Sequence, residues 1–392
     1  FQNMKSKETD TNFNPKVKYH YFYEYFKDHF NYGFGRPRVD ICGTCEKLKC
    51  TIESERNTAL KIKSESELKL HKLRAQSFYD SMKSCEKLVQ GDEKGVSEMI
   101  TFDFMQNIPV PHIPVGDMFY YRQPWVFIFG IHRFSDNKAF MYMYDETTGK
   151  KGPNEVVSLL MNFIETHVAD SVRKLYVFSD GCTGQNRNRT VVHFWYSLVH
   201  NSRFSVVRHM FPLRGHSYMA CDRDFSALEL KKRKQDTVYT PSQWYNILST
   251  SLKKMVFQMC PQSMFLDFVK HFDSFFKKSV TVKGHKWAVT SYKIFEYSSQ
   301  SKCVKVSPHC SGVVTYDFPL VKPGRHPTLL NVSPAYSDLI PIKAAKANDV
   351  AKMLDFIPEV YREYFKIIVD RFSDNAPEST PQESGSEVWD SD

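Results

Sequence analysis

Residues 97–235 alternate between strand-like and helix-like patterns in an order that few folds accommodate. Three segments rich in aromatic and β-branched residues follow one another and predict strands at 99–104, 119–134 and 139–144. Apolar residues at a 3.6-residue period then predict a helix over 154–168. The later segments predict a strand at 174–180, a helix at 186–199, a strand at 205–212 and a helix at 221–234. The predicted order is therefore βββαβαβα.

This order predicts an α/β fold with a mixed sheet of the RNase H-like type. Three antiparallel strands followed by two parallel strands with helical crossovers give that arrangement, whereas a flavodoxin-like fold needs a helix after its first strand. Residues 14–96 predict a helical region with a zinc site. Residues 236–372 predict an α+β extension, with helices over 245–276 and 350–372.

The two ends of the chain have compositions typical of disorder. Residues 1–13 are polar, and residues 373–392 are rich in Ser and Pro and carry six acids with no Lys or Arg. The whole chain nevertheless has a net charge of +9, which favours a polyanionic partner such as nucleic acid. The alternative is a basic protein without such a partner.

Membrane and secreted classes are excluded by the pattern of apolar residues and cysteines. No apolar run approaches the ~18–20 residues that a bilayer span requires. Nine cysteines without an export signal predict reduced thiols and a metal site, in the cytosol or nucleus.

Three aspartates fall where an RNase H-like sheet would bring them together. Asp103 lies inside the first predicted strand, Asp180 ends the fourth, and Asp222 opens the last helix. The first and fourth strands are neighbours in such a sheet, and the last helix packs against the same end. Carboxylates there could hold two Mg²⁺ or Mn²⁺ ions about 3.5–4 Å apart, which activate an attacking oxygen and stabilise a leaving one.

Each aspartate also has a structural interpretation. Asp103 could face solvent, Asp180 could begin an ordinary Asp-Gly turn, and Asp222 could serve the helix dipole. Asp224 lies about 200° around the helix from Asp222, so the two are not expected to reach one ion. Glu229, seven residues further on, shares a face with Asp222 and is an alternative third acid.

The loop after Asp180 has the composition of a phosphate-binding loop. Gln185 and Asn186 supply amide donors, Arg187 and Arg189 add positive charge, and a helix begins behind them. The sequence predicts DNA contacts for these four residues. An ordinary loop with a helix cap is the alternative.

Two further features lie on either side of the last helix. His216 could position water, shuttle a proton or bind phosphate in catalysis, or it could be a structural histidine. The basic run of Lys231, Lys232, Arg233 and Lys234 could bind the DNA backbone or serve as a nuclear import signal. A solvated helix end is equally compatible with it.

A cysteine cluster in the helical region predicts a structural zinc site. Cys42 and Cys45 form a Cys-x₂-Cys pair, and Cys50 and His71 could complete a tetrahedron. Cys85 is a rival for one of these positions. Free thiols near a helix start are the alternative to a metal.

Four stretches carry a resemblance to a known family: residues 37–45 (PRVDICGTC), 103–107 (DFMQN), 179–188 (SDGCTGQNRN) and 214–225 (RGHSYMACDRDF). They resemble transposase-like proteins spread through animal genomes, usually described as a domain of unknown function with an RNase H-like core. The resemblance runs from about residue 20 to 370. The Gly-His-Ser/Thr signature of that family, with an Asp six residues after the His, implies Asp222 as the third acid.

The resemblance implies descent from a cut-and-paste DNA transposase of the DDE/DDD type. Such an enzyme uses water and then a freed 3′-OH as nucleophiles, works in the nucleus, and acts as a homodimer on transposon ends. The chain departs from the family at Thr183, where a second Gly is usual. No separate DNA-binding domain precedes residue 20, so the end-recognition module is expected to be missing.

The combined prediction is a nuclear DNA transposase-like polynucleotidyl transferase that uses two metal ions, in an active, domesticated or inactive state. Its implied cofactors are Mg²⁺ or Mn²⁺ and Zn²⁺, and its implied partners are DNA and a second copy of the chain, without a membrane. The first alternative is a non-enzymatic, domesticated DNA-binding or scaffold protein that keeps the fold. A structure-specific nuclease without strand transfer is the second alternative.

Overall fold

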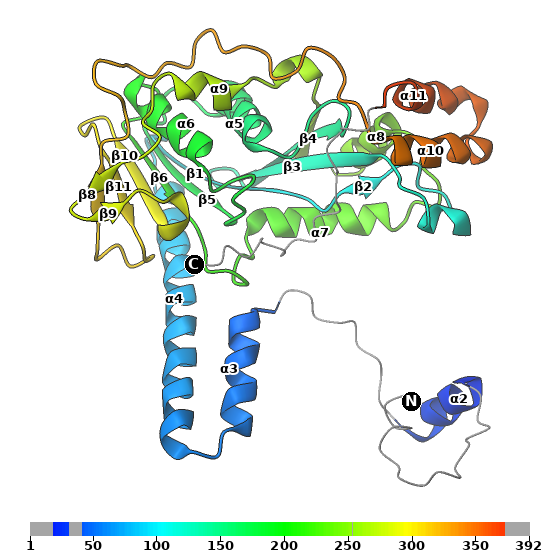
Figure 1. Ribbon diagram of the computed structural model, residues 1–392, viewed down its shortest axis with the longest axis horizontal. Coiled ribbons are helices and arrows are strands. Elements are labelled where there is room, and N and C mark those ends of the chain that lie inside the picture. Colours follow the sequence, from blue (N-terminus) through cyan, green and yellow to red (C-terminus); the bar gives the residue numbers. More distant parts are fainter. Residues whose placement is uncertain (1–18, 31–40, 253, 373–392) are drawn as a thin grey trace. The chain divides into compact units, whose positions relative to one another are not determined.

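The computed structural model describes residues 19–30, 41–252 and 254–372, and it is drawn in Figure 1. The chain divides into two compact units, residues 1–41 and 42–392. The described part of the first unit is helix α2 (Tyr19–His29), Phe30 and Ile41. The predicted disordered segments, 1–13 and 373–392, lie outside the described residues.

A large mixed sheet forms the centre of the second unit. Its strands are β1 (Ser97–Phe104), β2 (Ile108–Pro109), β3 (Trp125–Arg133), β4 (Lys138–Asp145), β5 (Lys174–Ser179), β6 (Val206–Met210), β7 (Met255–Met259), β10 (Ile294–Ser298), β11 (Val304–Ser307) and β12 (Tyr316–Phe318). In the described residues the order is β12-β11-β10-β6-β5-β1-β3-β4-β7, with β2 paired to β3. The predicted mixed α/β class is confirmed.

Strand directions change on either side of β1. It pairs parallel with β5 and antiparallel with β3. Outward from β5, strand β6 is parallel; outward from β3, strand β4 is antiparallel. The two-stranded hairpin of β8 (Thr281–Val282) and β9 (His285–Lys286) is separate from this sheet.

Helices cover both faces of the sheet. The α-helices described in the second unit are α3 (Gly43–Ser54), α4 (Thr58–Gln90), α5 (Pro153–His167), α6 (Arg189–His200), α7 (Ala220–Lys232), α8 (Pro241–Ser251), α9 (Phe268–Asp273), α10 (Ala344–Met353) and α11 (Glu359–Val369). Figure 1 shows α5, α6 and α9 on one face, with α7 and one end of α4 on the other. None of the helices in the described ranges combines the length and apolar character that a bilayer span requires.

Alternation along β1 assigns its side chains to these two faces. Ile100 and Phe102 belong to the apolar core that includes α5 and α6, whereas Met99 belongs to the core that includes α4 and α7. Because successive strand residues point to opposite faces, Thr101 and Asp103 lie on the α7 side with Met99. The solvent-facing alternative for Asp103 is therefore wrong.

The segment after residue 235 does not follow the helices predicted for it. The helix predicted over 245–276 is replaced by α8, strand β7 and the short α9. Met255–Met259 is a strand because it pairs parallel with β4, the edge left open by the β3–β4 hairpin. The helix predicted over 350–372 is broken at Pro358, which ends one helical segment and precedes α11.

Gly130 in β3 allows α7 to approach the sheet closely. A Cβ atom at this position would lie 2.4 Å from the Phe225 ring of α7. We expect Gly130→Val to destabilise the fold by ~1–3 kcal/mol, because overpacking displaces buried groups. Urea unfolding measures this loss. Gly116→Ala, where nothing lies within 4 Å of the new Cβ, is the matched control and is expected to be near neutral.

Candidate functional site

Asp103, Asp180 and Asp222 come together at one end of β1 and β5. The parallel register pairs Phe102 with Ser179, so Asp103 and Asp180 occupy the next position along each strand. Asp222 lies in the first turn of α7, which packs against β1 and β3. Each of the three side chains is partly exposed. Positions far apart in the sequence therefore meet at one surface.

The three carboxylates affect one another electrostatically. Burial raises the pKa of Asp103 well above its ordinary value, and the negative charges of Asp180 and Asp222 raise it further. A hydrogen bond from the Phe104 N–H, 2.7 Å from Asp103 Oδ1, acts in the opposite direction. Repulsion between carboxylates favours a shared proton or a nearby cation.

Backbone and amide donors hold two of the carboxylates in place. Asp180 Oδ1 accepts hydrogen bonds from the Cys182 N–H at 3.2 Å and from Asn186 Nδ2. Asp222 Oδ2 accepts one from the Met219 N–H at 2.7 Å, which closes the start of α7. Asp222 therefore caps the start of α7, and it also lies near enough to Asp103 to affect its pKa.

The neighbouring acids of α7 have other partners. Asp224 Oδ2 lies 2.8 Å from Nδ1 of the buried His132, within hydrogen-bond distance. Glu229 forms an ion pair with Lys232, at 2.6 Å. Asp222 is the acid of α7 whose negative charge acts to raise the pKa of Asp103, after burial and Asp180.

Lys151 was not expected from the sequence. Its ammonium donates to the Met105 carbonyl at 3.2 Å and to Asn107 Oδ1 at 2.9 Å. Burial lowers its pKa to about 8, while Asp103 and Asp180 act to raise it. A Lys-Lys-Gly-Pro turn before a helix is an ordinary sequence, so only the fold reveals that this lysine neighbours the carboxylates.

Cys182 and Cys221 lie beside the cluster as neutral thiols. Burial raises the pKa of Cys182 to about 12, and Asp180 and Asp103 contribute to the rise. Burial also raises the pKa of Cys221 well above its ordinary value, together with Asp222 and Asp103. Thiols held in this form are poor nucleophiles and poor metal ligands.

Three of the four loop residues predicted to contact DNA are buried in this structure: Gln185, Asn186 and Arg187. Asn186 is used to hold Asp180. Arg187 Nη2 donates to the carbonyls of Thr290 and Tyr292. The side-chain donors of Asn186 and Arg187 thus form hydrogen bonds within the protein, and those of Arg187 join the loop to residues 290–292.

The other residues predicted to contact DNA lie at helix ends. Arg189 is exposed at the start of α6, and Arg233 and Lys234 are exposed after α7. Lys231 is partly exposed, and Lys232 is partly exposed but paired with Glu229. These positions leave the predicted DNA contacts untested.

A second cluster contains Cys42, Cys45, His71 and His216. Their ligand atoms all lie within 4.8 Å of one another, and the group could bind a metal such as zinc. His71 Nε2 is 3.2 Å from Cys42 Sγ and 3.1 Å from His216 Nε2, which lies 3.5 Å from Cys45 Sγ. In the described part of the chain, this is the one such group of three or more His, Cys, Asp or Glu side chains.

Burial sets the protonation of this second cluster in the absence of an ion. It lowers the pKa of both histidines, with Arg74 contributing at His71 and His71 contributing at His216. It raises the pKa of Cys45, with a further contribution from Cys42. Neutral imidazoles are the form that binds metals, and a bound cation would reverse the rise in the pKa of Cys45.

The predicted zinc ligands need two corrections. Cys50 is exposed and outside the group, because five residues along α3 turn it about 140° away from Cys45. Cys85 is buried in the apolar core with Phe78 and is also outside the group. The fourth member of the cluster is His216, a residue that the sequence analysis predicts to act in catalysis.

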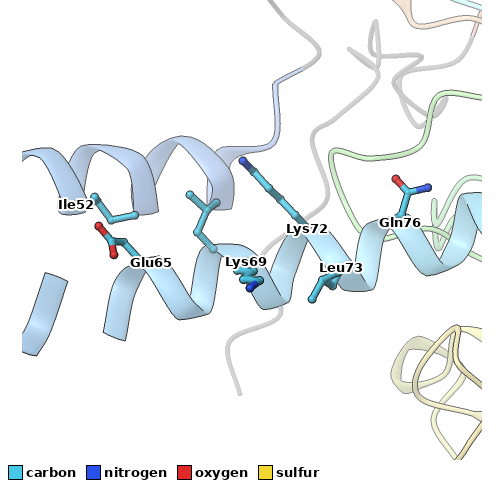
Figure 2. A pocket seen from close by; sticks show the side chains of 7 residues that line it. Ile52, Glu65, Lys69, Lys72, Leu73 and Gln76 are labelled. Carbon is cyan, nitrogen blue, oxygen red and sulfur yellow. The ribbon is translucent and has the colours of Figure 1, made fainter. Parts of the chain in front are cut away.

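The groove shown in Figure 2 lies elsewhere, on the α3–α4 hairpin. It has a volume of about 510 Å³. Its lining residues are Ile52 of α3 with Glu65, Leu68, Lys69, Lys72, Leu73 and Gln76 of α4. None of the site residues predicted from the sequence lines it.

Comparison with known proteins gives one family match. Residues 125–311 match the family described as "Domain of unknown function (DUF7869)". The matched segment contains Asp180, His216 and Asp222 but begins after Asp103 and after the helical hairpin. No curated protein matches the chain.

Proposed function

We propose that this chain is a transposase-like enzyme that cleaves and joins DNA phosphodiester bonds at Asp103, Asp180 and Asp222. The observation that carries the proposal is structural: the β1–β5 register sets Asp103 beside Asp180, and α7, with Asp222 in its first turn, packs against β1. A carboxylate inside a strand is costly to bury unless it has a paired or metal-binding role.

The arrangement of the sheet supports an RNase H-like core. The order β4-β3-β1-β5-β6 has antiparallel pairs on one side of β1 and parallel pairs on the other. Helix α5 joins β4 to β5, and α6 joins β5 to β6. The first and fourth strands predicted from the sequence are β1 and β5, and these two strands are neighbours in the sheet.

The three aspartates are not among the compact ligand groups of the described residues, so binding a divalent cation would have to draw their oxygens closer together. Asp103, Asp180 and Asp222 would hold Mg²⁺ or Mn²⁺, since such ions prefer carboxylate oxygens and would relieve the repulsion that raises the pKa of Asp103. When bound, these ions supply Lewis acidity toward the attacking and leaving oxygens. Asn186 and the Met219 N–H orient Asp180 and Asp222 for this role.

Lys151 and the exposed basic residues would act on the nucleic acid. Lys151 places a cation next to Asp103 and Asp180, where it could contact a phosphate oxygen. Arg189, Arg233 and Lys234 would bind the DNA backbone without reading its sequence, in a salt-sensitive manner. Nuclear location and pairing of two chains on transposon ends belong to the same proposal.

A nicking assay tests the proposed chemistry. Wild type is expected to convert supercoiled plasmid DNA to the nicked form with Mg²⁺ or Mn²⁺ and not with a chelator, whereas Asp180→Ala is expected to be inactive because it removes a ligand. Glu229→Gln is the matched control, since Glu229 is paired with Lys232, and it is expected to keep wild-type activity.

Two outcomes would contradict the proposal. Equal nicking by wild type and Asp180→Ala would place the activity elsewhere or in a contaminant. An inactive wild type that still binds DNA would favour the non-enzymatic DNA-binding or scaffold protein.

A further inference from the structure

We propose that Cys42, Cys45, His71 and His216 bind a structural Zn²⁺ ion that fastens the α3–α4 hairpin to the loop before α7. The ion would thereby fix the start of the helix that carries Asp222. This inference stands whether or not the aspartates catalyse a reaction, because it concerns the fold around them.

The spacing of the ligand atoms matches the edges of a zinc tetrahedron. With Zn–N of about 2.05 Å and Zn–S of about 2.3 Å, tetrahedral geometry gives N–N edges of ~3.4 Å and N–S edges of ~3.6 Å. The observed N–N distance, from His71 to His216, is 3.1 Å. Two of the four N–S distances are 3.2 and 3.5 Å, and all six edges lie within 4.8 Å. Small outward shifts would admit the ion.

The donor chemistry points to zinc in a closed site. Two thiolates and two imidazoles are softer ligands than Mg²⁺ accepts, and they form one of the ligand sets of structural zinc sites. Four protein ligands leave no open position for substrate or water. Both histidines turn Nε2 toward the centre, which leaves Nδ1 of each ring free of the metal.

The backbone around the cluster is shaped for close approach. Gly215, next to His216, has φ of +74°, and a Cβ atom there would lie 2.7 Å from Cys42 Cα. The loop thus needs glycine for both its conformation and its contact with the start of α3. Tyr79 of α4 adds a hydrogen bond from its hydroxyl to the His216 carbonyl, at 3.0 Å.

The same loop leads directly into the start of α7. Three residues after His216, the Met219 N–H donates to Asp222 Oδ2. A metal ion on His216 would therefore restrain a segment whose other end is closed by Asp222 itself.

Metal analysis of the purified full chain tests the ligand set. We expect about one zinc ion per chain in wild type and in Cys50→Ala, the matched control, because Cys50 is exposed and outside the cluster. We expect His216→Ala to bind zinc at least ~10-fold more weakly in competition with a chelator. Zinc-free wild type, or wild-type zinc affinity in His216→Ala, would overturn the proposal.

A second measurement separates ligand loss from misfolding. Cobalt-substituted His216→Cys is expected to show stronger thiolate charge-transfer absorption than cobalt-substituted wild type, because a third sulfur joins the ion. Far-UV circular dichroism checks that this variant is folded. Identical cobalt spectra in the two folded proteins would exclude His216 as a ligand.

Hydrogen exchange tests the mechanical role of the ion. Chelation of wild type is expected to speed exchange in residues 213–222 and at the start of α3, with β10–β12 unchanged as the internal control. Unchanged exchange in 213–222 after verified zinc removal would contradict the fastening role.

Discussion

Replacing Asp103 with asparagine is expected to abolish cation-dependent DNA cleavage and, at the same time, to stabilise the cation-free protein. The cleavage rate is expected to fall on the order of 10³-fold, as when a group that stabilises the transition state is removed. The free energy of unfolding is expected to rise by about 0.5–2 kcal/mol, because the substitution removes one of three mutually repelling carboxylates. Functional sites often retain such unfavourable interactions, so removing one commonly stabilises the fold.

The stability gain has a defined dependence on pH. Because folding raises the pKa of Asp103, the folded state binds more protons than the unfolded state between the ordinary aspartate pKa and the raised one. The free energy of unfolding of cation-free wild type therefore falls as pH rises through that window. Asp103→Asn has no proton to release there and is expected to show a flatter profile.

Thermal denaturation with a chelator and with Mn²⁺ measures both effects. Mn²⁺ is expected to raise the melting temperature of wild type and of Glu229→Gln, and to raise that of Asp103→Asn much less. A destabilised Asp103→Asn in the presence of chelator would show that the carboxylate is held by favourable contacts, which is contrary to the electrostatic argument.

Breaking the buried ion pair between Lys346 and Glu146 is expected to destabilise the fold by ~3–5 kcal/mol. Their side chains are only 8% and 6% exposed, and Glu146 also accepts a hydrogen bond from the Trp125 N–H at 3.1 Å. Lys346→Met would leave a buried carboxylate without its cation. The pair joins α10 to the β3–β4 hairpin, so α10 and α11 are expected to detach first.

The double variant Lys346→Met/Glu146→Gln separates the charge effect from packing. Glutamine keeps an acceptor for the Trp125 N–H and carries no charge, so we expect the double variant to recover most of the lost stability. Urea unfolding of wild type, both single variants and the double variant completes the cycle. Additive losses in the double variant would show that the two side chains act independently.

Most elements between residues 97 and 235 could be predicted because their signals are local. Alternation along β1 and the 3.6-residue period of α5 are properties of adjacent residues. The side of the sheet on which Asp103 lies follows from the same alternation once a helix is known to cover that face. The helix predicted over 245–276 failed because pairing of Met255–Met259 with β4 overrode local preference.

The residue types in the loop after Asp180 did not reveal which side chains form hydrogen bonds within the protein and which are available to a ligand. Asn186 and Arg187 have the chemistry of phosphate-binding residues, yet the fold uses their donors on Asp180 and on buried carbonyls. Lys151 has no distinctive neighbours in the chain, and its placement beside two carboxylates depends on how the turn before α5 meets the end of β1.

The sequence alone determined the alternation of strands and helices, the basic character of the chain, and the three aspartates and the Cys-x₂-Cys pair as candidate ligands. Periodicity, charge and short spacings are local quantities, and a single chain displays them directly. The tertiary structure alone decided that His216 completes the Cys/His cluster, that Asp222 lies where its charge acts on Asp103, and that Cys50 is outside the Cys/His cluster. The reason is that ligand sets and charge clusters depend on distances in space between residues that are far apart in the sequence. The spacing of residues along the chain does not give those distances.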